Sequence, residues 1–193
     1  MNAARMISAP APVGGVDSAA LLQRLRERIR QQPGVARVAL ADMPPFGGAE
    51  FKTAISTAIT PQPVEVRVAS VEGGYFEAMG IPLLAGSVFD DAPGTGNAEP
   101  ATGRHAGVLP VIVDELFRAH WLPAGAGVGA SVRLGEGDSA TVAQVVGIVP
   151  AVKQRQLSEA AQPMLYLPLG SAPGTVFLVT RTHADPAALA ALV

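Results

Sequence analysis

The sequence contains no cysteine, few aromatic residues and almost no net charge, and each shortage limits the structure or the partners that the protein can have. Without cysteine there are no disulfides and no thiolate zinc sites. Aromatic residues make up 5% of the chain against 49% for all apolar residues, so small aliphatic side chains are expected to form the core. The net charge of −2 argues against a nucleic-acid partner, because phosphate binding needs clustered positive charge.

Long uninterrupted apolar runs are also missing. The longest run without a charged residue spans residues 160–180 and is broken by prolines and glycines, among them Pro163, Pro168 and Gly170. A membrane-spanning helix needs about 20 consecutive, mainly apolar residues, so no such helix is expected here. Residues 1–15 lack the basic start and apolar centre of a signal peptide.

Residue groups that carry out catalysis or bind metals are scarce. His105, His120 and His183 lie in different segments, without the spacing of a metal site. The acidic pairs at residues 90–91 and 114–115 are explained as turn and cap residues, because adjacent side chains point apart in an extended chain. We therefore predict that the chain is not an enzyme and has no cofactor and no metal.

The N-terminal region alternates strand and helix signals. Residues 5–9 read as a weak strand, and Leu22, Leu25 and Ile29 form an apolar stripe at helical spacing. Residues 35–40 follow as a second strand. Strand, helix and strand in succession predict a βαβ unit.

The polar side of this predicted helix carries Arg24, Arg26, Arg28 and Arg30, and Pro33 ends the helix near residue 32. A basic face of this kind can dock a partner. A short basic run on a net acidic chain is more often a solvated surface, and we adopt that interpretation.

Residues 71–91 connect a strand to a short helix and then to a new extended segment. Valines alternate with charged residues over 64–68, which predicts a half-buried strand that pairs with residues 49–60 in a hairpin. Tyr75, Phe76 and Met79 then follow at helical spacing, so that one short helix can bury all three. A glycine after Met79 is placed to cap this helix, and a proline two residues later prevents its continuation.

The second half of the chain reads mainly as strands. Asp114 is placed to cap a short helix over 114–119, and Trp121 is expected to pack against that helix. Residues 164–167, bracketed by prolines, are predicted to form an edge strand. Residues 92–107 hold few bulky side chains and predict a mobile loop. The remaining expected elements are strands over 109–113, 132–134, 141–149 and 175–180, with the 142–149 stretch central, and a helix from residue 185.

Four segments together resemble the MacB-like periplasmic core domain, the extracytoplasmic part of FtsX-type permeases of ABC transporters. They are G-Y-F-E-A-M-G-I-P-L-L-A-G-S-V-F-D-D at 74–91, V-I-V-D-E-L-F-R-A-H-W at 111–121, V-V-G-I-V at 145–149 and Q-P-M-L-Y-L-P-L at 162–169. The second segment departs from the family pattern, since Asp114 stands where the family usually has asparagine. The permeases with duplicated core domains look most similar.

The resemblance implies an α+β fold of two interleaved units. One is a porter-like lobe with a ferredoxin-related βαβ arrangement, expected over residues 1–72 together with 174–193. The other is an inserted, mostly β lobe over residues 73–173. We expect the strand over 175–180 to lie in the same sheet as residues 35–40, because two strands cannot bury the helix stripe alone.

The resemblance also implies a function. The domain would lie on the periplasmic or extracellular side of the inner (cell) membrane and would couple cytoplasmic ATP-driven conformational change to a periplasmic partner or substrate. Its expected partners are the transmembrane helices of the permease and a separate ATP-binding subunit or domain, with a periplasmic adaptor protein or a second permease copy as further candidates. The alternative is a periplasmic ligand-sensing domain that binds a peptide or lipid between its lobes.

The residues that carry the family resemblance are expected to be structural rather than catalytic. They are Gly74, Tyr75, Phe76, Gly80, Pro82, Leu83, Gly86, Phe89, Trp121, Gly147, Tyr166 and Pro168.

Overall fold

A computed structural model describes residues 5–11, 16–43, 51–89, 108–153, 160–170 and 176–183, with side chains from residue 22 onward. The predicted loop over 92–107 and the predicted helix from residue 185 lie outside these residues. The described elements are mainly strands joined in one ten-stranded sheet, with few helices, so the fold is a sheet-dominated α+β fold. None of the helices in the described ranges is long and apolar enough to cross a membrane.

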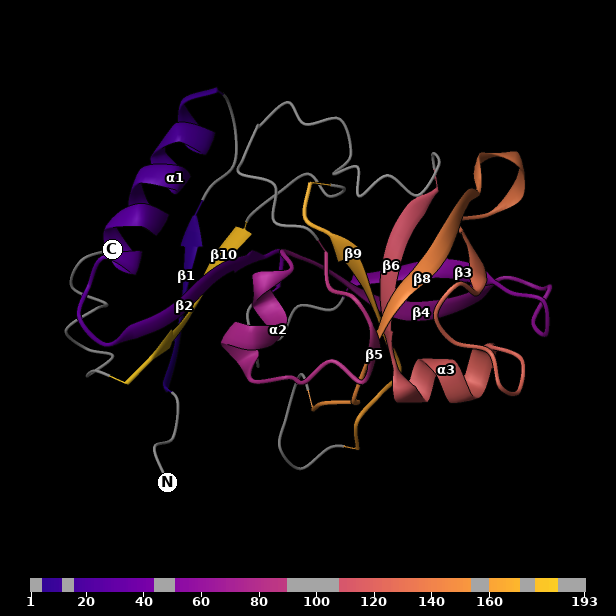
Figure 1. Cartoon of the computed structure of the whole chain (residues 1–193). Coiled ribbons are helices and arrows are strands. Elements are labelled where there is room, and N and C mark those ends of the chain that lie inside the picture. The colour runs from indigo at the N-terminus through magenta and orange to yellow at the C-terminus, as the bar shows by residue number, and fades with distance from the viewer. Residues whose placement is uncertain are drawn as a thin grey trace.

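Three strands form one end of the sheet, in the order β1 (Arg5–Ala11), β10 (Val176–Thr182) and β2 (Val35–Ala41). β10 is antiparallel to both neighbours, so β1 and β2 run parallel to each other. The prediction that the strand near 175–180 shares a sheet with residues 35–40 is therefore confirmed. The C-terminal strand lies directly between the two N-terminal strands (Figure 1).

The helix α1 (Val16–Arg30) covers one face of these strands. Leu22 and Ile29 are buried and Leu25 is partly buried, which confirms the predicted apolar stripe. They pack on Val38 and Leu40 of β2 and, among others, on residues of β10. A side chain of this kind contributes roughly 1.5–3 kcal/mol when fully buried. The helix ends at Arg30, slightly before the predicted end.

The remaining long strands close into a ring. They are β3 (Phe51–Ser56), β4 (Val64–Val71), β6 (Leu109–Asp114), β7 (Ser131–Leu134), β8 (Thr141–Val149) and β9 (Met164–Pro168). Their order is β4-β3-β7-β8-β6-β9, and β9 pairs back onto β4. A short strand, β5 (Ala85–Gly86), pairs with the end of β8, and a 3-10 turn over Gly137–Ser139 joins β7 to β8.

Alternation along each strand divides the side chains between two apolar clusters. Val111 and Val113 belong to the cluster of the ring, whereas Ile112 between them belongs to a cluster on the other face of the strand. The helix α3 (Glu115–Trp121) adds Phe117, which is fully buried, to the ring cluster. The ring cluster is the apolar cluster enclosed by these strands and α3. Its buried residues are Ile55, Val66, Val68, Val111, Val113, Phe117, Leu122, Val132, Ala143, Val145, Ile148 and Leu165.

The prediction that residues 164–167 form an edge strand is wrong. β9 lies between two neighbours, parallel to β4 and antiparallel to β6. Proline lacks a backbone N–H, so it removes one donor, at its own position only. Here Pro163 precedes the strand and Pro168 is its last residue. The residues between them keep their donors, so β9 can close the ring from inside the sheet.

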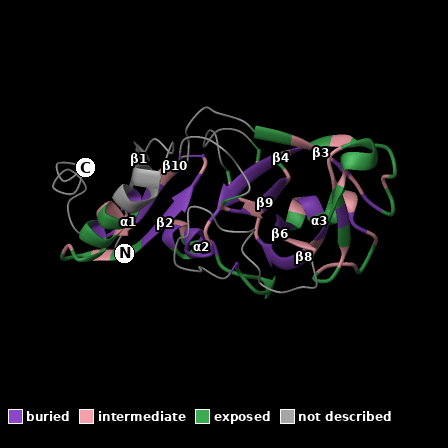
Figure 2. Cartoon of the chain, turned by 90° about the horizontal axis from the view of Figure 1, so that it is seen from above, coloured by how far each residue is buried: buried purple, intermediate pink, exposed green. Residues whose placement is uncertain are grey.

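The two predicted units share elements. β3 and β4, which were assigned to the first unit, supply Ile55, Val66 and Val68 to the ring cluster. The helix α2 (Gly74–Met79), assigned to the second unit, packs mainly against β2 and β10. The division at residues 72 and 73 stays a prediction, but the packing groups cross it. Figure 2 shows buried residues continuing from β2 through α2 to the strands of the ring.

Candidate functional site

The two ends of the molecule meet at α2, which lies between the three-stranded end and the ring (Figure 1). Local sequence determines this helix. Gly80 ends it with φ of 71°, a left-handed conformation that glycine adopts without strain. Its N–H donates to the Glu77 carbonyl, and the Ile81 N–H donates to the Phe76 carbonyl at 2.7 Å. The predicted short helix and its glycine cap are confirmed.

Three aromatic rings fill the centre of this region. Tyr75 and Phe76 of α2 meet edge-to-face with ring centroids 5.7 Å apart, and Phe76 meets Tyr166 of β9 in the same way at 5.1 Å. All three side chains are buried. Edge-to-face pairs contribute about 0.5–1.5 kcal/mol each beyond the area that they bury. These three aromatic side chains therefore fasten α2 to the closed ring of β-strands.

Small residues complete the contact on the other side of α2. Ala39 and Ala41 of β2 and Val179 of β10 are buried in the same cluster as the aromatic rings. We call this the joint cluster; its buried members are Ala39, Ala41, Met43, Ala69, Val71, Tyr75, Phe76, Ala78, Ile81, Phe89, Ile112, Val146, Val149, Met164, Tyr166 and Val179. Buried apolar side chains from both ends therefore fill this contact.

The segment after α2 is fixed to β8 at two glycines. Gly86 pairs with Gly147, and Gly86 has φ of 79°. A Cβ at Gly86 would collide with the Val146 carbonyl oxygen, and a Cβ at Gly147 would collide with the Ser87 carbonyl oxygen. Since both obstacles are backbone atoms, the close approach requires glycine at both positions. Buried Phe89 anchors the end of this segment in the joint cluster.

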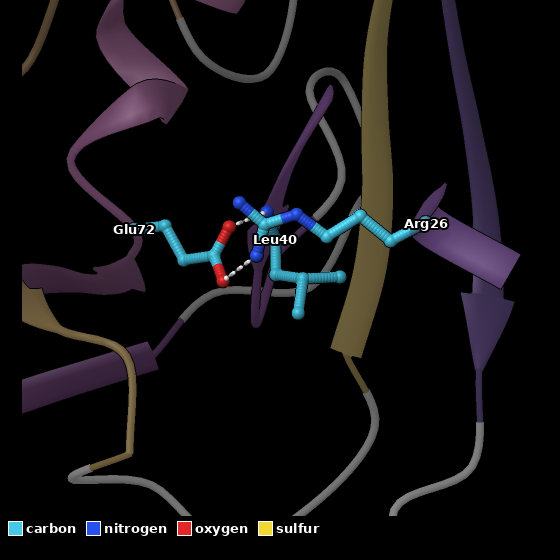
Figure 3. A network of polar contacts seen from close by, with 3 residues as sticks. All are labelled: Arg26, Leu40 and Glu72. Carbon is cyan, nitrogen blue, oxygen red and sulfur yellow. Dashed lines mark hydrogen bonds and ion pairs between the residues drawn. The ribbon is translucent and has the colours of Figure 1, made fainter. Parts of the chain in front are cut away.

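A polar network joins α1 to the crossing of β2 and β4 (Figure 3). Arg26 of α1 donates from Nη1 to Glu72 Oε1 at 2.8 Å, and the two side chains are only 20% and 16% exposed. The second carboxylate oxygen of Glu72 accepts the backbone N–H of Leu40 at 2.9 Å. Arg26 is therefore not part of a solvated face, which corrects the sequence interpretation for this residue; Arg24, Arg28 and Arg30 are exposed.

Asp42 makes a similar bond on the other side of the crossing. Its Oδ1 accepts the backbone N–H of Ser70 at 2.9 Å. Burial raises the pKa of Asp42, and the bonds with Ser70 oppose this without cancelling it.

Asp114 is fully buried at the end of β6. Its Oδ1 accepts the Phe117 N–H at 2.7 Å, which confirms the predicted N-cap, and its Oδ2 accepts the Met164 N–H at 3.1 Å. Burial raises its pKa to about 6, although both bonds favour the charged form. Glu115 accepts the Ala151 N–H at 3.3 Å and so has a separate partner. The Asp114 carboxylate thus holds β6, α3 and β9 together.

The residues that carry the family resemblance gather at α2 and its neighbours, with one exception. Trp121 is the last residue of α3, where its ring contacts Phe117 and His120. Those at or beside the joint are Gly74, Tyr75, Phe76, Gly80, Pro82, Leu83, Gly86, Phe89, Gly147, Tyr166 and Pro168. Their structural importance stays a prediction.

Sequence reasoning did not find Arg26, Asp42 and Glu72 as a group. They come from three segments, and Arg26 and Glu72 are 46 positions apart. Only the position of Glu72, directly after an alternating strand and before two glycines, gave a local sign of a special role. Over the described parts of the chain, no three His, Asp or Glu side chains lie close enough to hold a metal ion.

The fold and the joint define a sheet-dominated α+β domain in which a closed ring of strands continues into a helix-covered, three-stranded end of the same sheet. A family model, the MacB-like periplasmic core domain, matches residues 3–193, and the chain belongs to this family. Its homologues are the periplasmic or extracellular domains of ABC transporter permeases. A comparison with curated proteins gave no match.

Solved structures of such domains share the fold. The extracellular domain of the noncanonic ABC-type transporter YknZ from Gram-positive bacteria is 10% identical with a TM-score of 0.57, over 97% of this chain and 88% of that one. The periplasmic region of MacB from Actinobacillus actinomycetemcomitans is 12% identical with a TM-score of 0.59, over 97% and 80%. A domain of a putative permease from Porphyromonas gingivalis is 17% identical with a TM-score of 0.57, over 95% and 78%.

Proposed function

We propose that this chain is the periplasmic or extracellular domain of an ABC permease in the inner (cell) membrane and that it transmits conformational change. ATP hydrolysis in the cytoplasm would move the transmembrane helices of the permease, and the domain would pass this movement to a partner or substrate outside the membrane. The domain itself would neither bind nucleotide nor catalyse a reaction. Its proposed partners are the rest of the permease, a separate ATP-binding subunit, and a periplasmic adaptor or a second permease copy.

The joint is the observation that carries this proposal. Transmission of movement through a domain needs firm contacts between its parts, since loosely connected parts would move independently. Here α2 fastens β2 and β10 to β4, β8 and β9 through a shared apolar cluster. The residues of the family resemblance also gather there, so the family pattern coincides with the connection between the two ends.

We further assign α1, β1, β10 and β2 to the porter-like, ferredoxin-related lobe. The support is the arrangement of β1 and β2, which are parallel, joined through α1 and separated by the antiparallel β10. A split βαβ arrangement of this kind is typical of ferredoxin-related folds. The ring of strands would then be the second lobe, with β3 and β4 contributing to it.

Reconstitution of the permease that carries this domain, with its ATP-binding subunit in lipid nanodiscs, tests the proposal. A fluorophore on a cysteine at Glu136, an exposed residue of the β7–β8 connection, would report the distance from the bilayer through quenching by spin-labelled lipids. We expect quenching to differ between the nucleotide-free and vanadate-trapped complexes. A subunit that cannot hydrolyse ATP is the control, and equal quenching in both states would refute transmission through the domain.

A further inference from the structure

The crossing of β2 and β4 has an unusual bonding pattern. These strands are neighbours in the sheet, yet among the residues that the structure describes only Ala41 and Val71 pair in register. One backbone bond flanks this pair on each side: the Asp42 N–H donates to the Ser70 carbonyl at 2.9 Å, and the Glu72 N–H donates to the Leu40 carbonyl at 3.0 Å. An ordinary antiparallel ladder has many more such bonds. The backbone alone therefore gives the crossing little resistance to rotation.

Side-chain carboxylates supply the return bonds. Leu40 donates its N–H to Glu72 Oε2, and Ser70 donates its N–H to Asp42 Oδ1, both at 2.9 Å. In each case the carboxylate belongs to the residue that already donates its own N–H across the crossing. The pattern is thus nearly symmetric about the Ala41–Val71 pair. Bonds to a charged acceptor are stronger than bonds between neutral groups.

Arg26 extends this pattern to α1. Its guanidinium holds the Glu72 carboxylate from the helix that covers the outer face of β2, so one ion pair connects α1, β2 and β4. The apolar contact of β2 with α2 lies beside this crossing. On the β2 side it is made by small side chains, because Ala39 and Ala41 face the joint cluster. Small side chains interdigitate little and resist sliding of packed elements less than large ones do.

We propose that the β2–β4 crossing is a pivot between the three-stranded end and the ring, and that the Arg26–Glu72–Leu40 network is the lock that sets its angle. With the ion pair intact, the lock holds the two ends at one angle and they move together; when the lock is removed, the single pair in register and the alanine surface offer little resistance to rotation and sliding. This inference concerns the isolated domain and holds whether or not the proposed transport role is correct.

Distance measurements between the two ends test the lock directly. The chain has no cysteine, so no native cysteine has to be replaced before labelling. Arg28→Cys on α1 and Glu136→Cys on the ring of strands provide the two sites for spin labels. Both positions are exposed. In the otherwise unchanged domain, pulsed electron paramagnetic resonance should give one narrow distance distribution. With Arg26→Met, which keeps an apolar stem and removes the charge, the distribution should broaden or shift.

Hydrogen exchange provides a second readout. In Arg26→Met and Glu72→Gln, we expect the Leu40 amide to exchange about tenfold faster, because its acceptor is weaker or less well held. Amides of Val145 and Leu165 in the ring should keep their protection, which shows that the variants are folded. If Arg26→Met does not fold, Arg26→Lys, which keeps the charge on a shorter group, should give a smaller change in the same direction.

Glu77→Gln is the matched control. It removes the ion pair of Glu77 with Arg37, which also joins α2 to β2 but is largely exposed, at 64% for Glu77 and 44% for Arg37. This variant should leave the distance distribution and the Leu40 exchange unchanged. The proposal is wrong if Arg26→Met leaves the distance distribution as in the unchanged domain, even where the Leu40 amide exchanges faster, because the bond would then not set the angle. It is also wrong if Glu77→Gln changes the distance distribution equally, since the joint would then respond to any lost charge.

Discussion

Asp114 should make the domain more stable in mild acid than at neutral pH, in contrast to most salt-bridged carboxylates. Its side chain is fully buried between β6, α3 and β9. The test is the isosteric variant Asp114→Asn, which has nearly the same shape and does not titrate. We compare the free energies of unfolding of the two proteins across pH.

The sign follows from the raised pKa. The folded pKa of Asp114 is about 6 and the ordinary value is 3.8, so between these values the folded state holds a proton that the unfolded state has lost. The contribution to stability is fully present below pH 3.8 and is lost as the pH rises through 6. Since one pKa unit corresponds to 1.36 kcal/mol, the whole window is worth about 3 kcal/mol.

Urea unfolding at several pH values between 7 and 4, followed by circular dichroism, measures this contribution. The free energy of unfolding of the unchanged domain should rise relative to that of Asp114→Asn by up to about 3 kcal/mol as the pH falls. Asp42, whose pKa is also raised by burial, acts in the same direction in both proteins and is removed by the subtraction.

The two terms in this prediction are separable. At pH 7 the variant gains from losing a buried charge and loses an acceptor, because its amide nitrogen would face one of the two N–H groups, that of Phe117 or that of Met164. The difference in unfolding free energy between the two proteins at a single pH therefore does not test the pKa of Asp114. The change of that difference with pH does. A difference that stays constant from pH 7 to pH 4 would refute the raised pKa.

The remaining predictions concern packing and ligand binding. Gly147→Ala should cost about 1–3 kcal/mol of unfolding free energy, since its Cβ would meet the backbone oxygen of Ser87. Gly127→Ala, whose Cβ meets only the flexible end of Ile148, should cost much less. Urea unfolding compares the two variants, and equal losses of unfolding free energy would contradict the argument. Val179→Asp should cost roughly 3 kcal/mol or more, because it places a charge in the joint cluster, and hydrogen exchange of residues 35–40 should rise with it. Calorimetric titration with ATP and Mg²⁺ should give no binding, and a micromolar affinity would overturn the non-enzymatic, nucleotide-free role proposed here.

Local elements followed from sequence because their causes are local. The α2 helix, its Gly80 cap, the hairpin of β3 and β4 and the Asp114 cap each depend on residues within a few positions of one another. Backbone conformation at glycine and the capping of a free N–H are decided at that range. The family resemblance rests on the same kind of short segment, and the family that it indicates is confirmed.

Contacts between distant segments were decided by the tertiary structure. The prolines beside β9 predicted an edge strand, but they restrict only their own donors, and the closing of the ring depended on the free edges of β4 and β6. Arg26 looked like one of several solvated arginines until α1 packed across β2 and brought it to Glu72. Burial and pairing of this kind depend on which surfaces meet, and side-chain spacing within one segment carries no information about that.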